Sequence, residues 1–111
     1  MPTYMFQGCY STAAVAAMVQ TPQDRSVAVR ELVESLGGKL VGFWLALGEY
    51  DFVGIAELAD ANTVAALSIA ASARGSVQRF KSTALLSGID GMNAFRKASS
   101  VKYQPPNKET T

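Results

Sequence analysis

Apolar residues along this chain fall into short strand-like runs that are separated by helical patterns. The strand-like runs are rich in aromatic and aliphatic residues and cover residues 3–10, 39–47, 50–58 and 76–86. Helical patterns cover residues 12–19, 22–36, 61–74 and, more weakly, 91–99. The chain therefore alternates between the two types of element without any long unstructured insertion.

Residues that favour helix ends flank these helical patterns. We expect Ser11 to cap the first helix, and Thr21 to cap the second with Pro22 at its first position. Asp60 or Asn62 is expected to cap the third helix. A Gly-Gly pair after the second helix and a single glycine after the third provide the stop signals.

The order strand, helix, strand, strand, helix, strand predicts an α+β, ferredoxin-like βαββαβ fold. In this fold a four-stranded antiparallel sheet carries both helices on one face. We expect residues 1–99 to form a single domain that ends in a short C-terminal helix, and residues 100–111 to form a flexible polar tail.

The predicted strands are apolar on both faces. A strict alternation along residues 39–47 would leave both faces of that strand apolar, with Leu40, Gly42, Trp44 and Ala46 opposite Val41, Phe43, Leu45 and Leu47. A sheet of this kind needs a cover on each side, so we expect a homodimer or higher homo-oligomer that pairs through the open sheet face. Alternatively, the helix at 91–99 folds over part of that face and reduces the interface.

Charge and composition exclude several classes of protein. Ten Lys and Arg residues against nine Asp and Glu give a net charge of +1, and no basic cluster is present, so neither nucleic acid nor an anionic membrane is an expected partner. No apolar run reaches membrane-spanning length and the N-terminus lacks a secretion signal, which predicts a cytoplasmic protein.

The residue types present also limit the chemistry. One cysteine excludes an internal disulfide, and the absence of histidine removes the commonest metal ligand together with every Ser-His or Cys-His arrangement. No metal site and no cofactor is therefore predicted.

Three segments, MPTYMF, LGGKLVGFWLALGEYDFVGIAEL and RGSVQRFKSTALLS, resemble the GYD-domain family of small bacterial proteins, which is named after a Gly-Tyr-Asp element. The resemblance extends from about residue 2 to residue 86, and Glu49 occupies the variable position between the glycine and the tyrosine. It implies a ferredoxin-like fold related to the dimeric α+β barrel proteins. The biochemical function of the family is largely unassigned.

The Gly48-Glu49-Tyr50-Asp51 segment has two interpretations. In the structural one it forms the corner between two strands, with Asp51 accepting backbone N–H groups and Tyr50 packing over the sheet edge. In the chemical one Asp51 is a general base and Tyr50 an acid at the mouth of a cavity.

Two other sets of residues are candidates for ligand binding. Arg79 and Lys81, placed on one face of the last strand together with Val77, have the spacing to hold a carboxylate or phosphate, or to pair with Glu57. Aromatic and polar-tipped strand residues form the second set, which by analogy with the α+β barrel proteins would line a pocket for a small molecule: Tyr4, Gln7, Tyr10 and Trp44.

The sequence predicts a small oligomeric ligand-binding or accessory protein of the dimeric α+β barrel type, with a small aromatic or anionic molecule as the possible ligand. The alternative is a cofactor-independent enzyme, a monooxygenase or isomerase, that acts on an aromatic or conjugated small molecule. A third possibility is a structural or stress-related assembly protein that binds no small ligand.

Overall fold

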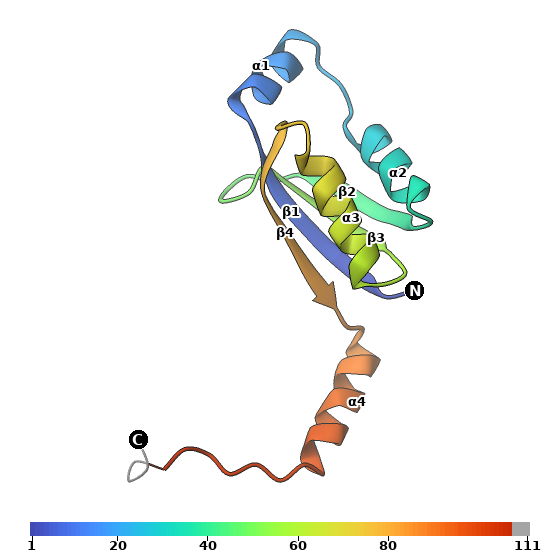
Figure 1. Ribbon diagram of the computed structural model, residues 1–111, viewed down its shortest axis with the longest axis vertical. Coiled ribbons are helices and arrows are strands. Elements are labelled where there is room, and N and C mark those ends of the chain that lie inside the picture. Colours follow the sequence, from blue (N-terminus) through green and yellow to red (C-terminus); the bar gives the residue numbers. More distant parts are fainter. Residues whose placement is uncertain (108–111) are drawn as a thin grey trace.

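The computed structural model describes residues 1–107. One antiparallel sheet has the strand order β2-β3-β1-β4 and carries helices, an α+β ferredoxin-like arrangement as predicted (Figure 1). In chain order the elements are β1 (Thr3–Tyr10), α1 (Thr12–Gln20), α2 (Ser26–Ser35), β2 (Lys39–Leu45), β3 (Phe52–Glu57), α3 (Ala61–Ser72), β4 (Val77–Leu85) and α4 (Gly88–Ser99).

The hydrophobic core lies between one face of the sheet and the helices α2 and α3. Its buried members come from both layers: Phe6, Val33, Leu40, Phe52, Ala56, Leu58, Val64 and Leu67. Aromatic rings extend it along the sheet, because Phe52 packs against Phe43 at 5.5 Å and against Tyr10 at 5.1 Å between ring centroids, and Phe80 stacks on Phe6 at 5.9 Å. Burial of these side chains holds α2 and α3 against the sheet.

Two of the three predicted helix caps are confirmed. Ser11 accepts a hydrogen bond from the N–H of Ala14, and Asp60 accepts one from the N–H of Thr63. Asp60, rather than the alternative Asn62, is thus the cap of α3.

The prediction that Thr21 caps the second helix is wrong. Thr21 instead closes α1 by donating its backbone N–H to the carbonyl of Ala17, and α2 begins only at Ser26. The carboxylate of Asp24 accepts hydrogen bonds from both the N–H and the hydroxyl of Ser26, at 2.9 and 2.7 Å. A helix that began at Pro22 would use the N–H of Ser26 for an intrahelical bond, and here that N–H bonds the side chain of Asp24 instead. Residues 22–25 therefore form a connection between two helices.

The alternation predicted for β2 is interrupted by a bulge. The register of β2 against β3 shifts between Leu40 and Gly42. Phe43 pairs with Gly54 and therefore faces the core side with Leu40, whereas a strict alternation would place them on opposite faces.

A second bulge corrects the prediction for β4. Arg79 has φ 55°, and the register against β1 shifts between Gln7 and Cys9. Val77 and Phe80 consequently both pack against the core, so Val77 does not share a face with Lys81. In both strands one extra residue changes which side chains share a face. Residues that a regular strand would place on one face then lie on opposite faces, and the reverse.

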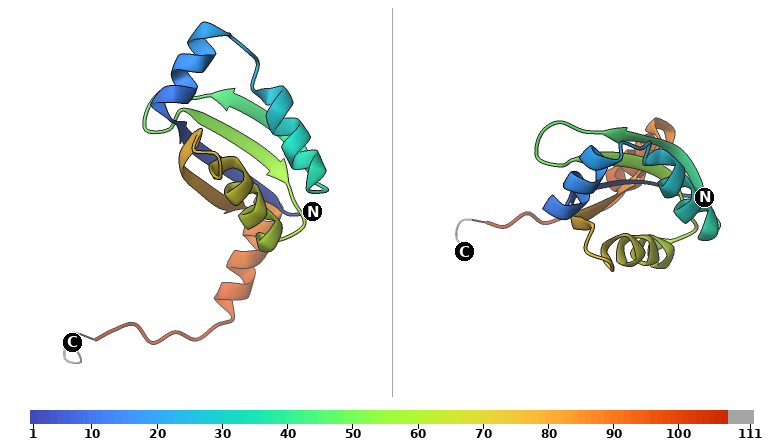
Figure 2. Two further views of the ribbon diagram at one scale, coloured as in Figure 1. Left: turned by 45° about the horizontal axis from the view of Figure 1, so that its top comes forward. Right: turned by 90° about the horizontal axis from the view of Figure 1, so that it is seen from above.

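The sheet face opposite the core carries no helix (Figure 2). Its central side chains, Met5, Val53 and Ile55, are half-buried by their neighbours, and Trp44 at the edge remains 51% exposed. We refer to the surface formed by Met5, Trp44, Val53, Ile55 and Thr83 as the open face.

The C-terminal helix does not cover the open face. α4 begins at Gly88, three residues before the predicted start, and Ser87 caps it. It projects beyond the end of β4 with Phe95 80% exposed (Figures 1 and 2). The alternative in which this helix folds over the sheet is therefore wrong. Residues 100–107 form neither helix nor strand, and the rest of the predicted tail lies outside the described residues.

Within residues 1–107, every helix is too short or too polar to cross a membrane.

Candidate functional site

The Gly-Tyr-Asp segment lies in the loop between β2 and β3, where Asp51 is held by the backbone. Its carboxylate accepts a hydrogen bond from the N–H of Tyr10 at 2.9 Å, and its own N–H donates to the carbonyl of Gly8 at 2.8 Å. Its carbonyl accepts from the N–H of Ala46, also at 2.8 Å. Each of these bonds ties the loop to the sheet, which is the geometry of the structural interpretation.

Arg79 reaches the same loop, whereas Lys81 lies opposite Gln7 of β1. Its guanidinium lies 5.5 Å from the ring centroid of Tyr50 and 3.3 Å from a carboxylate oxygen of Glu49. The Arg79–Glu49 pair is largely exposed, so it contributes little to stability. The two cations are not brought together as one anion-binding pair, because the bulge at Arg79 redirects its side chain.

The four aromatic and polar candidates are divided between the two faces of the sheet. Gln7 and Trp44 lie on the side of the open face, where Gln7 pairs with Lys81 across the strands and the indole of Trp44 covers Gly42. Tyr4 faces the helices and packs against the core. Tyr10 lines a pocket.

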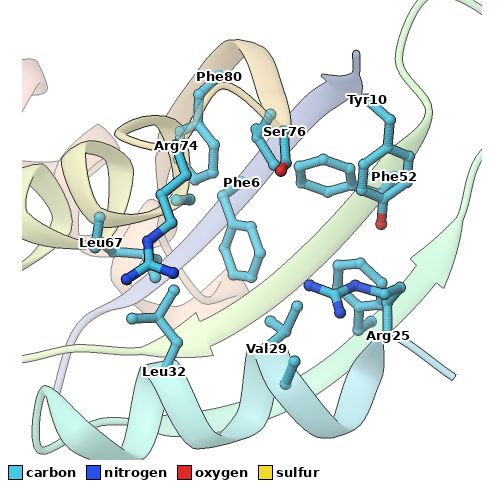
Figure 3. Close-up of a pocket in the computed structure, with 15 residues that line it drawn as sticks. Phe6, Tyr10, Arg25, Val29, Leu32, Phe52, Leu67, Arg74, Ser76 and Phe80 are labelled. Carbon is cyan, nitrogen blue, oxygen red and sulfur yellow. The ribbon is translucent and has the colours of Figure 1, made fainter. Parts of the chain in front are cut away.

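That pocket is a cavity of about 240 Å³ between α2, α3 and the sheet (Figure 3). Aromatic side chains of the sheet form its floor, and aliphatic residues of the two helices form its walls. The floor consists of Phe6, Tyr10, Phe43, Phe52 and Phe80. Ala70 and Ala71 lie on the α3 side, where larger residues would reduce the space.

Two arginines reach the pocket from opposite sides. Arg25 precedes the first turn of α2 and Arg74 follows the end of α3, and both side chains point toward the cavity (Figure 3). Arg25 donates a hydrogen bond to the side-chain oxygen of Gln23 at 2.8 Å. Within residues 1–107, neither arginine forms an ion pair with a carboxylate. The rim of an otherwise apolar pocket is therefore positively charged.

Tyr10 supplies a hydroxyl at this rim. Burial raises the pKa of the Tyr10 phenol, and the neighbouring Arg25 acts in the opposite direction through its charge and a hydrogen bond. The phenol is therefore neutral at physiological pH and able to donate a hydrogen bond beside a guanidinium.

A wider groove of about 560 Å³ adjoins the pocket and shares Tyr10, Arg25 and Phe43 with it. It lies between α1, the connection at residues 22–25 and the β2–β3 loop, with Val15, Met18 and Leu47 among its apolar residues. Asp24 and Asp51 also line it, and both carboxylates accept hydrogen bonds from backbone N–H groups.

Arg25 and Arg74 were not among the residues predicted from the sequence. In the ferredoxin-like topology the start of the first helix and the end of the second lie at the same end of the sheet. A search of helix termini for like charges could therefore have found the pair. Within the described part of the chain, no three acidic or cysteine side chains cluster as a metal site would require.

The sequence pattern of the GYD domain matches residues 4–94. This protein belongs to the GYD-domain family. The chain is 32% identical over 78 residues to the glutamine synthetase and cystathionine beta-lyase binding protein of Thermus thermophilus, an alignment that covers 70% of this chain and 82% of the relative.

The fold of this GYD-domain protein is also similar to the crystal structure of TTHA0845, a protein from Thermus thermophilus, with a TM-score of 0.52 at 17% identity. The similarity covers 79% of this chain and 96% of the other. At this level of identity it supports the shared fold only.

Proposed function

We propose that this GYD-domain protein is a small binding or accessory protein that acts as a homo-oligomer and holds a small molecule between α2, α3 and the sheet. The observation that carries the proposal is the cavity of about 240 Å³ with an aromatic floor. A hollow lined by rings with polar groups at its rim is suited to an apolar ligand, and the adjoining groove of about 560 Å³ extends it.

Self-association would cover the open face. Each open face carries four apolar side chains, so eight lose water when two such faces meet, and each contributes roughly 1–2 kcal/mol because most are already half-buried. The sum, on the order of 10 kcal/mol before association costs, favours a homodimer with two-fold symmetry or a larger assembly. The pocket lies on the other side of the sheet and stays accessible in that arrangement.

The relative from Thermus thermophilus is named for binding two enzymes, which supports a role in contact with other proteins. We propose that this chain likewise acts by binding a partner enzyme in the cytoplasm. The surfaces then have separate roles, with the open face used for self-association and the helical side for the ligand and the partner.

A catalytic role is the second candidate, and one observation favours it. Tyr10 places a neutral phenol beside Arg25 at the edge of an aromatic cavity, an arrangement that would donate hydrogen bonds to the oxygen of a bound conjugated molecule and polarise it. Asp51, the residue that the sequence suggested as a base, has its carboxylate engaged by the N–H of Tyr10.

Native mass spectrometry of the protein purified from its own host tests the proposal. We expect an assembly of two or more chains that carries a non-covalent small molecule, released when the assembly is activated in the gas phase. A single chain without any added mass would contradict both parts of the proposal.

A further inference from the structure

We propose that the molecule held in this pocket is an amphiphilic carboxylate, whose acid group lies between Arg25 and Arg74 and whose apolar part lies on the aromatic floor. The inference rests on the proposed role of the pocket as a ligand site, and it names the chemical class of the ligand.

The charge of the pocket lining is the first argument. Fifteen residues line it, and among them are two guanidinium groups and no carboxylate. Asp24 and Asp51 line the adjoining groove, which shares Arg25 with the pocket, and accept backbone hydrogen bonds there. Arg25 is half-buried and Arg74 is exposed, and within residues 1–107 neither has a carboxylate as an ion-pair partner. An anion bound between them would supply the partner that both guanidinium groups lack.

The geometry of the two arginines is the second argument. Because one is at the start of α2 and the other just after α3, their side chains approach the cavity from opposite sides (Figure 3). A guanidinium presents paired N–H donors that match the two oxygens of a carboxylate. The hydroxyls of Tyr10 and Ser76 lie in the same lining and supply further donors.

The remaining residues of the lining determine what the rest of the ligand, beyond its acid group, must be. Apart from the arginines and two hydroxyls, the pocket consists of aromatic, aliphatic and alanine side chains. Such a surface binds a ring or short hydrocarbon chain, and its few polar groups are too few to pair the many hydroxyls of a sugar. A volume of about 240 Å³ suits one ring with a short acidic side chain.

Isothermal titration calorimetry with two matched probes tests this inference on the full-length protein. The probes are 3-phenylpropanoate and its neutral amide, 3-phenylpropanamide, which differ in charge and hardly in shape. They are titrated into the wild type and into Arg25→Met and Arg74→Met, which keep an apolar stem and remove the charge. Arg96→Met, on the distant α4, is the matched control.

We expect the wild type and Arg96→Met to bind the acid at least about tenfold more tightly than the amide, since charge-assisted hydrogen bonds are the stronger ones. Arg25→Met and Arg74→Met should each lose most of that preference while their affinity for the amide is unchanged. Thermal unfolding confirms that the variants are folded, and Arg→Gln at the same positions replaces any variant that is not.

Two results would overturn the inference, and together they separate a failure of the inference alone from a failure of the proposed function. If the amide and the acid bind equally well, the pocket is a ligand site without the proposed preference for an anion. If neither probe binds at millimolar concentration, the pocket does not act as a site for this class of ligand, and the binding role itself is contradicted.

Discussion

The carboxylate of Asp51 accepts a hydrogen bond from the backbone N–H of Tyr10 at 2.9 Å, which joins the Gly-Tyr-Asp loop to the last residue of β1. The side chain of Tyr10 points into the pocket between the helices and the sheet. The element that gives the family its name is thus connected to the pocket through Tyr10, in addition to Phe52, which follows Asp51 in the chain. Its aspartate positions the end of a strand, and the strand in turn supplies a phenol to the pocket rim.

This arrangement predicts how Asp51 responds to substitution. Asp51→Ala should lower the free energy of unfolding by about 1–2 kcal/mol, because the N–H of Tyr10 loses a charged acceptor. Asp51→Asn should lower the free energy of unfolding by less than half as much, since its amide oxygen still accepts the hydrogen bond from the N–H of Tyr10. Urea denaturation at neutral pH measures both values. A fully stable Asp51→Asn protein that no longer binds its ligand would instead indicate a chemical role for the carboxylate.

The second prediction concerns Gly54 in the centre of the sheet. A methyl group at this position would overlap the ring of Phe6, which is buried in the core. Gly54→Ala should therefore lower the free energy of unfolding by about 2–3 kcal/mol, because the ring must leave its packed position. Gly91→Ala is the control, since Gly91 lies in α4 with open space around it, and there alanine should stabilise the helix slightly. Equal effects at the two positions would contradict the packing described for the core.

The third prediction concerns pH. Hydrogen bonds from the N–H and hydroxyl of Thr63 hold the pKa of Asp60 below its ordinary value of 3.8. A lowered pKa in the folded state means that the stabilisation is present above the unfolded-state value and is lost as the pH falls through the folded-state value. Asp60→Ala should therefore melt a few degrees below the wild type at pH 7, and this difference should shrink as the pH is lowered from about 5 toward 2.

Asp60→Asn serves as the control for this titration. Asparagine caps a helix but carries no charge to titrate, so its melting temperature should stay near that of the wild type at pH 7. If the melting temperature of Asp60→Ala stayed below that of the wild type by the same amount down to the lowest pH, the charge of Asp60 would not be the source of the stabilisation.

The order of elements could be predicted from the sequence because the apolar residues of strands and helices recur with different periods, two and 3.6. Which side chains of β2 and β4 face the core could not be predicted, because alternation assigns faces correctly only in a strand without an inserted residue. Val41 lies at one register shift and Arg79 at the other, and nothing in their side chains indicates a bulge. One extra residue in each strand moved Phe43 and Val77 to the core side.

The candidate site was predicted only in part. Tyr10 was found because an aromatic residue with a polar tip at the end of a strand is a reasonable lining residue. Arg25 and Arg74 were not predicted, since they are separated by almost 50 positions. They line one pocket only because α2 and α3 lie side by side over the sheet. Sequence proximity favoured Arg79 and Lys81 instead, and the bulge between β1 and β4 separates that pair.

The claim on which the account depends is that a second copy covers the open face, and the molar mass in solution tests it most directly. Size-exclusion chromatography with light scattering would compare the wild type with Ile55→Lys, which puts a charge in the middle of that face, and with Ile69→Lys on the exposed side of α3. We predict that the wild type and Ile69→Lys have the mass of at least two chains, and that Ile55→Lys, still folded by circular dichroism, has the mass of one. A wild type that has the mass of a single chain at the highest accessible concentration would contradict the account.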